Sequence, residues 1–180
     1  MNKTLFSVIG KCCLLSLITL QAALAFNQSG DLTVTAGAGY DYFSNKRWME
    51  NTGIPFGIIG YNLTDHWGVE GLLGFFYTTS RDLATFGKDV SGTMFALDAV
   101  YHFSPYKFAQ PYFLAGPGVM GFSPNGNDAN NEGNLNAAVG VELFTNEIVA
   151  FRIEARDFYT FVGGKNDILL NGGVTFFIAT

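Results

Sequence analysis

The sequence predicts an all-β fold: an eight-stranded antiparallel up-and-down transmembrane barrel after an N-terminal signal peptide. Three observations lead to this prediction. Segments of about ten residues alternate between apolar side chains and polar or small ones, which is the period of two of a β-strand. Charged residues make up only 14% of the chain, against ~25% in a soluble domain. Short turns alternate with longer polar loops, the asymmetry of an outer-membrane barrel.

The first part of the chain is expected to be removed on export. Residues 1–25 combine a basic leader, an apolar core and an A-x-A cleavage site that ends at Ala25, as secretory signal peptides do. Residues 26–180 then form one outer-membrane barrel domain. Both cysteines, Cys12 and Cys13, lie in the leader, so we expect neither a disulfide nor thiol chemistry in the exported chain.

The exported chain is acidic. Without the two lysines of the leader, 8 of the 10 Lys and Arg residues remain against 15 Asp and Glu, a formal charge of 8 − 15 = −7. An acidic chain without a basic patch argues against nucleic acid as a partner. We also expect no cofactor.

The first two strands are predicted at 31–43, where the alternation is clearest, and at 54–63. Residues 44–53 between them carry charge, Asn and Gly and are expected to form a loop. Adjacent isoleucines obscure the face of the second strand, and we favour outward positions for Ile59 and its period-two neighbours Tyr61 and Leu63.

The next strands are predicted at 67–79, 90–103 and 110–122. In the first of them Glu70 shares the inward face, and in the second Asp98 does so. Pro117 of the third cannot donate to a β-ladder, which suggests a bulge or the rim of the sheet.

A hairpin at 136–144 and 149–159 carries the most informative pattern. One face is apolar or small, and the other carries Glu142, Arg152, Glu154 and Arg156. This pattern suits a barrel whose outside faces lipid and whose narrow inside is filled by paired charges. The last strand is predicted at 167–180.

Two features could suggest a metal site or a catalytic site: the loop at 123–134 and the two histidines. The loop is rich in oxygen ligands, but its spacing differs from that of an EF-hand, so we expect a surface loop and no metal. His66 and His102 are predicted at the periplasmic side, with Ser104 near His102, and no acid completes a catalytic set. We therefore predict that the protein is not an enzyme.

Four segments resemble the eight-stranded outer-membrane barrels of the OmpA and OprF type: LDAVYHF at 97–103, QPYFLAGPGV at 110–119, VGVELFTNEIVAFRIEARD at 139–157 and GGVTFFI at 172–178. The resemblance covers nearly all of the exported chain, without the family's peptidoglycan-binding domain. It implies a multi-pass protein of the cell outer membrane, in contact with lipid, lipopolysaccharide and the barrel-assembly machinery.

The resemblance also assigns two sets of residues. A salt-bridge network plugs the lumen in this family, and its inward charged places correspond to Glu70, Asp98, Glu142, Arg152 and Glu154. Asp98 stands where some members have lysine, so the charge balance differs here. The end of the chain resembles the assembly signal through Asn171, Gly173, Phe176 and Ile178, although it closes with Ile-Ala-Thr instead of an aromatic residue.

These observations support one main function and two alternatives. The main hypothesis is a non-enzymatic barrel with a plugged lumen, which supports envelope integrity and displays loops near Lys46, Arg81, Asn127 and Lys165 to a surface or host ligand. The first alternative is a narrow porin-like channel for small solutes or ions, in which the arginines are opposed to the four acids. The second is a soluble periplasmic barrel with its aliphatic face inward.

Overall fold

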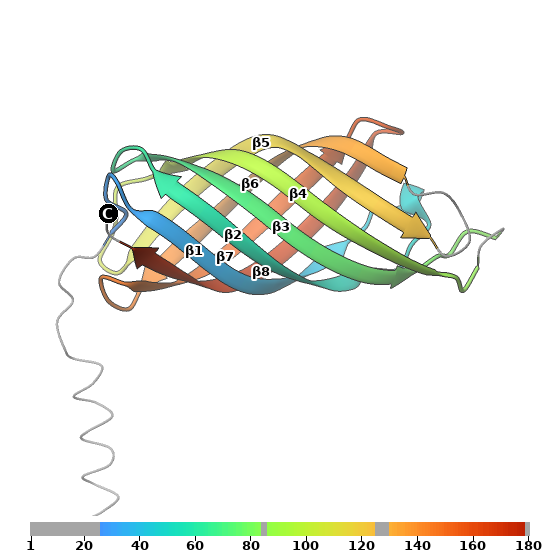
Figure 1. Cartoon of the computed structure of the whole chain (residues 1–180), viewed down its shortest axis with the longest axis horizontal. Coiled ribbons are helices and arrows are strands. Elements are labelled where there is room, and N and C mark those ends of the chain that lie inside the picture. The colour runs from blue at the N-terminus through green and yellow to red at the C-terminus, as the bar shows by residue number, and fades with distance from the viewer. Residues whose placement is uncertain (1–25, 84–85, 125–129, 179–180) are drawn as a thin grey trace, which may run out of the picture.

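The protein is an eight-stranded antiparallel barrel, in which each strand pairs with its neighbours in the chain and β1 closes the ring with β8 (Figure 1). The computed structural model describes residues 26–83, 86–124 and 130–178. The predicted fold class is therefore confirmed, whereas the predicted signal peptide lies outside the described residues. No helix in the described ranges is long and apolar enough to cross a membrane.

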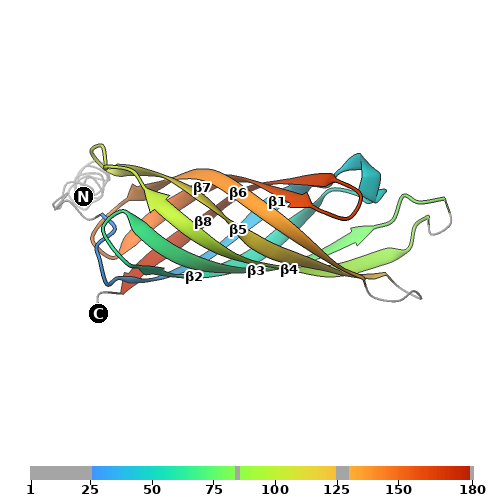
Figure 2. The same ribbon diagram turned by 90° about the horizontal axis from the view of Figure 1, so that it is seen from above.

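The strands tilt strongly against the barrel axis, as Figures 1 and 2 show from two directions. In chain order the elements are β1 (Leu32–Tyr42), the 3-10 helix η1 (Asn45–Arg47), β2 (Thr52–Asn62), β3 (Trp67–Thr79), β4 (Asp89–His102), β5 (Ala109–Pro124), β6 (Asn130–Phe144), β7 (Val149–Thr160) and β8 (Lys165–Ile178).

The stagger of the strands fixes the width of the lumen. A path along register partners leaves β1 at Tyr42, crosses β8 and the other strands in turn, and returns to β1 at Leu32, ten residues earlier in the chain. A tilted barrel of eight strands has an interior just wide enough for side chains to fill. The inward residues must therefore pack against one another.

The two ends of the barrel differ. The described ends of the chain and the turns β2–β3, β4–β5 and β6–β7 lie at one end (Figure 1). The opposite end carries η1 and the long β3–β4 connection. Because outer-membrane barrels have short periplasmic turns and longer extracellular loops, we assign the end with the termini to the periplasm.

The outward face is apolar, and the charged face points inward. Ile59, Tyr61 and Leu63 are exposed, as the sequence predicted, and the outward positions of the other strands are also largely aliphatic or aromatic. Aromatic residues mark both rims, with Tyr40, Tyr42, Tyr77 and Tyr159 at the extracellular end. The alternative of a soluble barrel, which would turn its charged face to water, is therefore wrong.

The structure corrects two details around β5. β5 continues to Pro124 and β6 begins at Asn130, so both strands extend into the predicted loop 123–134. Pro117 lies neither at a rim nor at a bulge, because the pairs Ala96↔Gly118 and Ala99↔Ala115 keep one register on both sides of it. A missing N–H interrupts a ladder without shifting it.

A bulge does occur in the β2–β3 wall. The ladder ends at Phe56↔Gly74, beside Pro55, and pairing resumes at the bridge Met49↔Ser80. Six residues (50–55) on one side face five (75–79) on the other. The one extra residue is a bulge, a feature common at barrel rims. The bulged segment 50–55 includes the last two residues of the β1–β2 connection.

We predict that Gly116→Ala destabilises the barrel. A Cβ at Gly116 would lie 2.0 Å from the carbonyl oxygen of Leu97, a backbone atom of β4 that cannot move without opening the wall. Overpacking of this kind costs roughly 1–3 kcal/mol, so the urea midpoint of unfolding in detergent should fall. Gly71→Ala is the matched control because its Cβ would meet nothing closer than 4.0 Å. Equal midpoints for the two variants would contradict the prediction.

Candidate functional site in the barrel lumen

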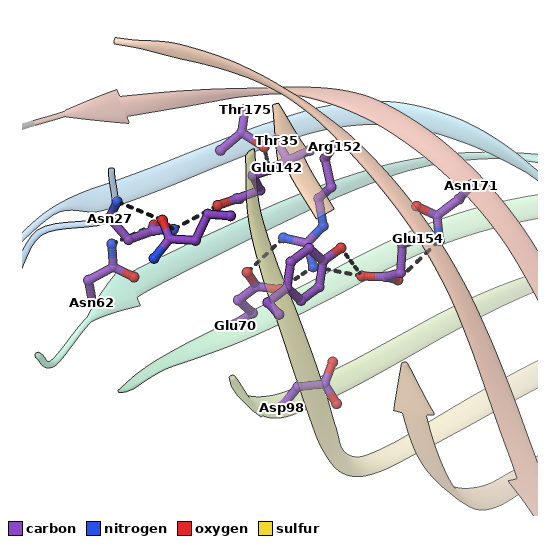
Figure 3. Close-up of polar contacts among 12 residues, drawn as sticks. Asn27, Thr35, Asn62, Glu70, Asp98, Glu142, Arg152, Glu154, Asn171 and Thr175 are labelled. Atoms are coloured by element: carbon purple, nitrogen blue, oxygen red, sulfur yellow. Dashed lines mark hydrogen bonds and ion pairs between the residues drawn. The ribbon is translucent and has the colours of Figure 1, made fainter. Parts of the chain in front are cut away.

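Five of the six predicted lumen charges form one connected chain of ion pairs. Arg152 donates to both carboxylate oxygens of Glu70, at 2.7 and 2.8 Å, and to Glu154 at 2.7 Å (Figure 3). The other oxygen of Glu154 accepts from Arg156 at 2.8 Å, and Arg156 reaches Asp98 at 2.7 Å. All five residues are buried. The chain joins β7 to β3 on one side and to β4 on the other.

Neutral side chains complete the coordination of Glu154. The Tyr112 hydroxyl donates to Glu154 at 2.8 Å, and the Asn171 amide donates at 3.0 Å. The Tyr112 ring also lies under the Arg152 guanidinium, 4.4 Å from Cζ to the ring centroid. Gly140 makes room for this ring, since a Cβ there would lie 2.2 Å from the Tyr112 oxygen. The buried carboxylate is thus surrounded by donors, which offsets the cost of its desolvation.

Glu142 belongs to a separate polar cluster at the periplasmic end. Glu142 stands opposite Arg152 in the β6–β7 ladder, but in the described part of the chain it makes no ion pair with either arginine. Its carboxylate instead accepts from the Asn27 amide at 2.7 Å (Figure 3). The Asn27 amide also donates to Gln110 at 3.1 Å and accepts from Asn62 at 2.9 Å. The segment before β1 therefore folds into the mouth of the barrel.

Much of the extracellular half of the lumen is apolar, although Asp41 and Asn134 are also buried there. Its buried apolar side chains come from the central and extracellular parts of the strands, with Phe43 added from the β1–β2 connection. The aromatic members pack edge to face, with Phe76 contacting both Phe43 and Phe122. The other large members are Ile54, Phe56, Ile58, Leu72, Met94, Met120, Phe158 and Leu169. This apolar layer fills the lumen mainly on the side of β2 to β5. The inward face of β6 stays polar from Glu132 through Asn134 to Asn136, which accepts from Arg156.

A second charged cluster closes that mouth, and the sequence analysis missed it. Arg47 enters from η1 and donates to Asp167 at 2.8 and 2.9 Å, to Glu132 at 2.6 Å and to the Thr160 hydroxyl at 2.7 Å. Lys165 also donates to Glu132, at 2.6 Å. Only 3% of the Arg47 side chain is exposed. Arg47 was expected in a surface loop, and loops have no periodicity that reveals an inward side chain.

The electrostatics of this cluster favour a charged Arg47. Burial alone would lower the pKa of the Arg47 guanidinium, but hydrogen bonds and charges from Asp167 and Glu132 outweigh burial and raise that pKa above its ordinary value. The guanidinium is therefore a permanent cation that binds the β1–β2 connection to β6 and β8.

The predicted assembly-signal residues divide between the two faces of β8. Asn171 lies in the lumen beside Glu154, and Gly173 allows close packing, since a Cβ there would lie 2.8 Å from the carbonyl oxygen of Ala36. Phe176 and Ile178 face outward. The first two are thus explained by the folded barrel itself. Recognition by the assembly machinery stays a prediction.

The histidines make only a local contact. His66 Nδ1 lies 2.9 Å from the carbonyl oxygen of His102, and His102 is buried against the ring of Tyr112. Neither is hydrogen-bonded to Ser104 in the described ranges. The described residues contain no group of three or more His, Cys, Asp or Glu side chains arranged to hold a metal.

A closed barrel with an apolar outer face and a lumen filled by paired charges is an integral outer-membrane β-barrel. The chain belongs to the family described as outer membrane protein beta-barrel domain, which matches residues 12–176. It is therefore a multi-pass protein of the cell outer membrane.

The similar proteins are barrels of the same kind. The chain is 34% identical over 118 residues to outer membrane porin F of Pseudomonas aeruginosa, across 64% of this chain and 32% of that protein. It thus spans about a third of the curated relative. The N-terminal barrel of Pseudomonas aeruginosa OprF matches 84% of this chain and 100% of its own at a TM-score of 0.60 and 22% identity. The structure of OprG from the same organism covers 86% of this chain and 99% of its own, with a TM-score of 0.64 and 14% identity.

We predict strong coupling between Arg152 and Glu70. Arg152→Gln leaves Glu70 buried without its cation, which should cost roughly 3–5 kcal/mol of unfolding free energy. The double variant Glu70→Gln, Arg152→Gln should lose less than the sum of the two single variants, because the buried charge is gone. Urea unfolding in detergent measures all three.

The control for these three variants is Lys88→Gln, a substitution at an exposed residue. It should change the unfolding free energy by no more than about 0.5 kcal/mol. Additive losses for Glu70→Gln and Arg152→Gln would mean that the two side chains do not act as a pair.

Proposed function

We propose that the protein is a non-enzymatic structural barrel, sealed to solutes, that contributes to envelope integrity and presents its extracellular loops to ligands. The observation that carries this proposal is the continuous filling of the lumen. Side chains occupy it from the Asn27 cluster, through the ion-pair chain and the apolar layer, to Arg47 at the extracellular mouth.

The ion-pair chain supports a structural role. Its arginines bridge β7 to β3 and β4, which are distant in the sequence. Removal of one partner would leave a buried charge without compensation, so the pairs hold the strands at one register and one separation. A conducting path would instead need side chains that leave a continuous polar gap.

The loops support a role at the cell surface. Trp48 and Arg81 are exposed beside the extracellular mouth. Lys46 and Lys165 are tied into the rim through Gly164 and Glu132, and Asn127 lies outside the described residues. Lipopolysaccharide of the outer leaflet and a surface or host ligand are the proposed partners of this rim.

Export and assembly complete the proposal. Residues 1–25 act as the signal peptide. The barrel-assembly machinery reads the end of β8, where Phe176 and Ile178 present their side chains to the outside.

The alternative is a narrow channel for small solutes or ions. One observation favours it: several buried polar atoms in the lumen have no hydrogen-bond partner among the described residues. They include Arg152 Nε, Arg156 Nη2 and Asn171 Oδ1, and, nearer the extracellular mouth, the side-chain atoms of Asp41 and Asn134. Polar atoms of this kind suit hydration. The bulky apolar side chains beside these polar atoms leave little room for ions to pass.

We predict that the wild-type barrel gives no resolved conductance in planar bilayers, and that Arg152→Ala stays closed because the apolar layer persists above the altered site. A porin of known conductance in the same bilayer checks the recording. Heat-modifiable migration on gels checks that both proteins are folded barrels. Wild-type conductance steps that change in Arg152→Ala would establish the channel and end the sealed-barrel proposal.

A further inference from the structure

The geometry points to a binding site for a phosphorylated sugar in the pocket beside Trp48. This pocket has a volume of about 550 Å³ and is lined by Asn45, Lys46, Trp48, Met49 and Arg81. Ligand pockets typically enclose ~300–1,000 Å³. The inference rests on the surface-loop role proposed above and names the chemistry that this loop would recognise.

Trp48 is held in a conformation that an unconstrained chain would avoid. Its φ of 52° and ψ of 41° lie in the left-handed region, which is costly for a residue with a large side chain. Its carbonyl oxygen accepts from the backbone N–H of Arg81, and the next residue, Met49, bridges to Ser80. Trp48 is nevertheless 62% exposed. The backbone at Trp48 is therefore strained, while its aromatic side chain is exposed to solvent.

Neighbouring residues anchor this presentation from two sides. Arg47 points into the lumen and is bound there by Asp167 and Glu132. Lys46 donates to the carbonyl oxygens of Gly163 and Gly164, at 3.2 and 2.7 Å, across the mouth. The loop is therefore organised before any ligand arrives, which reduces the entropy lost on binding.

Two cationic residues, Lys46 and Arg81, line the pocket together with Trp48 and favour an anionic group. The Lys46 ammonium has three donors and gives two of them to carbonyl oxygens. The Arg81 side chain is 54% exposed, and among the described residues its ion pair is with Glu50 at 3.7 Å. Such an exposed pair is weak, so a phosphate dianion can replace Glu50 as the partner of the guanidinium fork.

The rest of the pocket suits a sugar ring. An exposed indole offers a flat face against which the C–H groups of a pyranose stack, and the Asn45 amide can donate to and accept from hydroxyl groups. Arg81 follows Tyr77 of the aromatic rim by four residues. At ~3.3 Å per residue and a tilt of ~40°, the pocket stands roughly 10 Å above that rim. Phosphorylated core sugars of the outer-leaflet glycolipid lie at this level.

The test uses Trp48 as its own reporter. The chain has two tryptophans, and Trp67 faces outward at the periplasmic end, so Trp67→Phe leaves Trp48 as the only one. This protein in phospholipid nanodiscs is titrated with glucose 6-phosphate, glucose or inorganic phosphate. We expect a saturable change in Trp48 fluorescence with glucose 6-phosphate, and none with the other two at equal concentration.

Two added substitutions locate the site. Arg81→Gln should weaken glucose 6-phosphate binding about tenfold through loss of the charged fork. Lys88→Gln removes a charge from the same β3–β4 connection outside the pocket, and it should leave the affinity unchanged. The absence of a saturable change, an equal response to phosphate alone, or equal losses in both variants would overturn the inference.

Nanodiscs with lipopolysaccharide distinguish the source of the sugar. Altered Trp48 fluorescence before any sugar is added, abolished by Arg81→Gln, would place the ligand on the glycolipid. A response to the free sugar phosphate alone would place it among soluble ligands, and both results support the site. Conductance is measured separately, so a conducting barrel would refute the sealed-lumen proposal without touching this one.

Discussion

The Glu154 carboxylate accepts from two buried arginines at once, and the filling of the barrel depends on this shared acceptor. Every second residue of this part of β7 is charged: Arg152, Glu154 and Arg156. All three therefore point into the lumen, which has little room for anything except side chains. Two arginines this close would repel each other without the acid between them. The alternation of sign lets one strand carry its charges into the centre and extend them to Glu70 and Asp98.

This arrangement also specifies the register of the sheet. A slip of β7 by one residue would turn Arg152 and Arg156 toward lipid, where an arginine at the bilayer midplane costs roughly 2–4 kcal/mol. The apolar layer also opposes this slip, because Phe158 of β7 would turn away from its apolar contacts in the lumen. The periplasmic half is thus held mainly by directional hydrogen bonds, and the extracellular half mainly by close packing of Phe, Met, Ile and Leu side chains. Arg47 then binds the β1–β2 connection over the mouth.

The parts of this arrangement that follow from local periodicity could be predicted from the sequence. Alternation placed the strands and the inward faces of Glu70, Asp98 and the β7 charges, because side chains of a strand must alternate between two environments. It could not assign partners, since these depend on the stagger between strands, and Glu142 consequently pairs with Asn27 and not with an arginine. The inward positions of Asn27 and Arg47 were not predicted, because both residues reach the lumen from outside a strand. Arg47 is followed by Trp48, whose left-handed backbone conformation cannot be predicted from a periodic pattern.

The most direct test of a filled lumen is the reactivity of a thiol placed within it. Residues 26–180 contain no cysteine, so Ala138→Cys introduces a single thiol at a buried inward position beside the ion-pair chain. Its labelling by a water-soluble methanethiosulfonate reagent, in barrels reconstituted in liposomes, is compared with that of Ser29→Cys at the exposed periplasmic end. A sealed lumen predicts that Ser29→Cys is labelled and that Ala138→Cys resists labelling until the barrel is unfolded. Labelling of Ala138→Cys in the folded barrel at a rate close to that of Ser29→Cys would show that water and solutes reach the lumen, and would contradict the account.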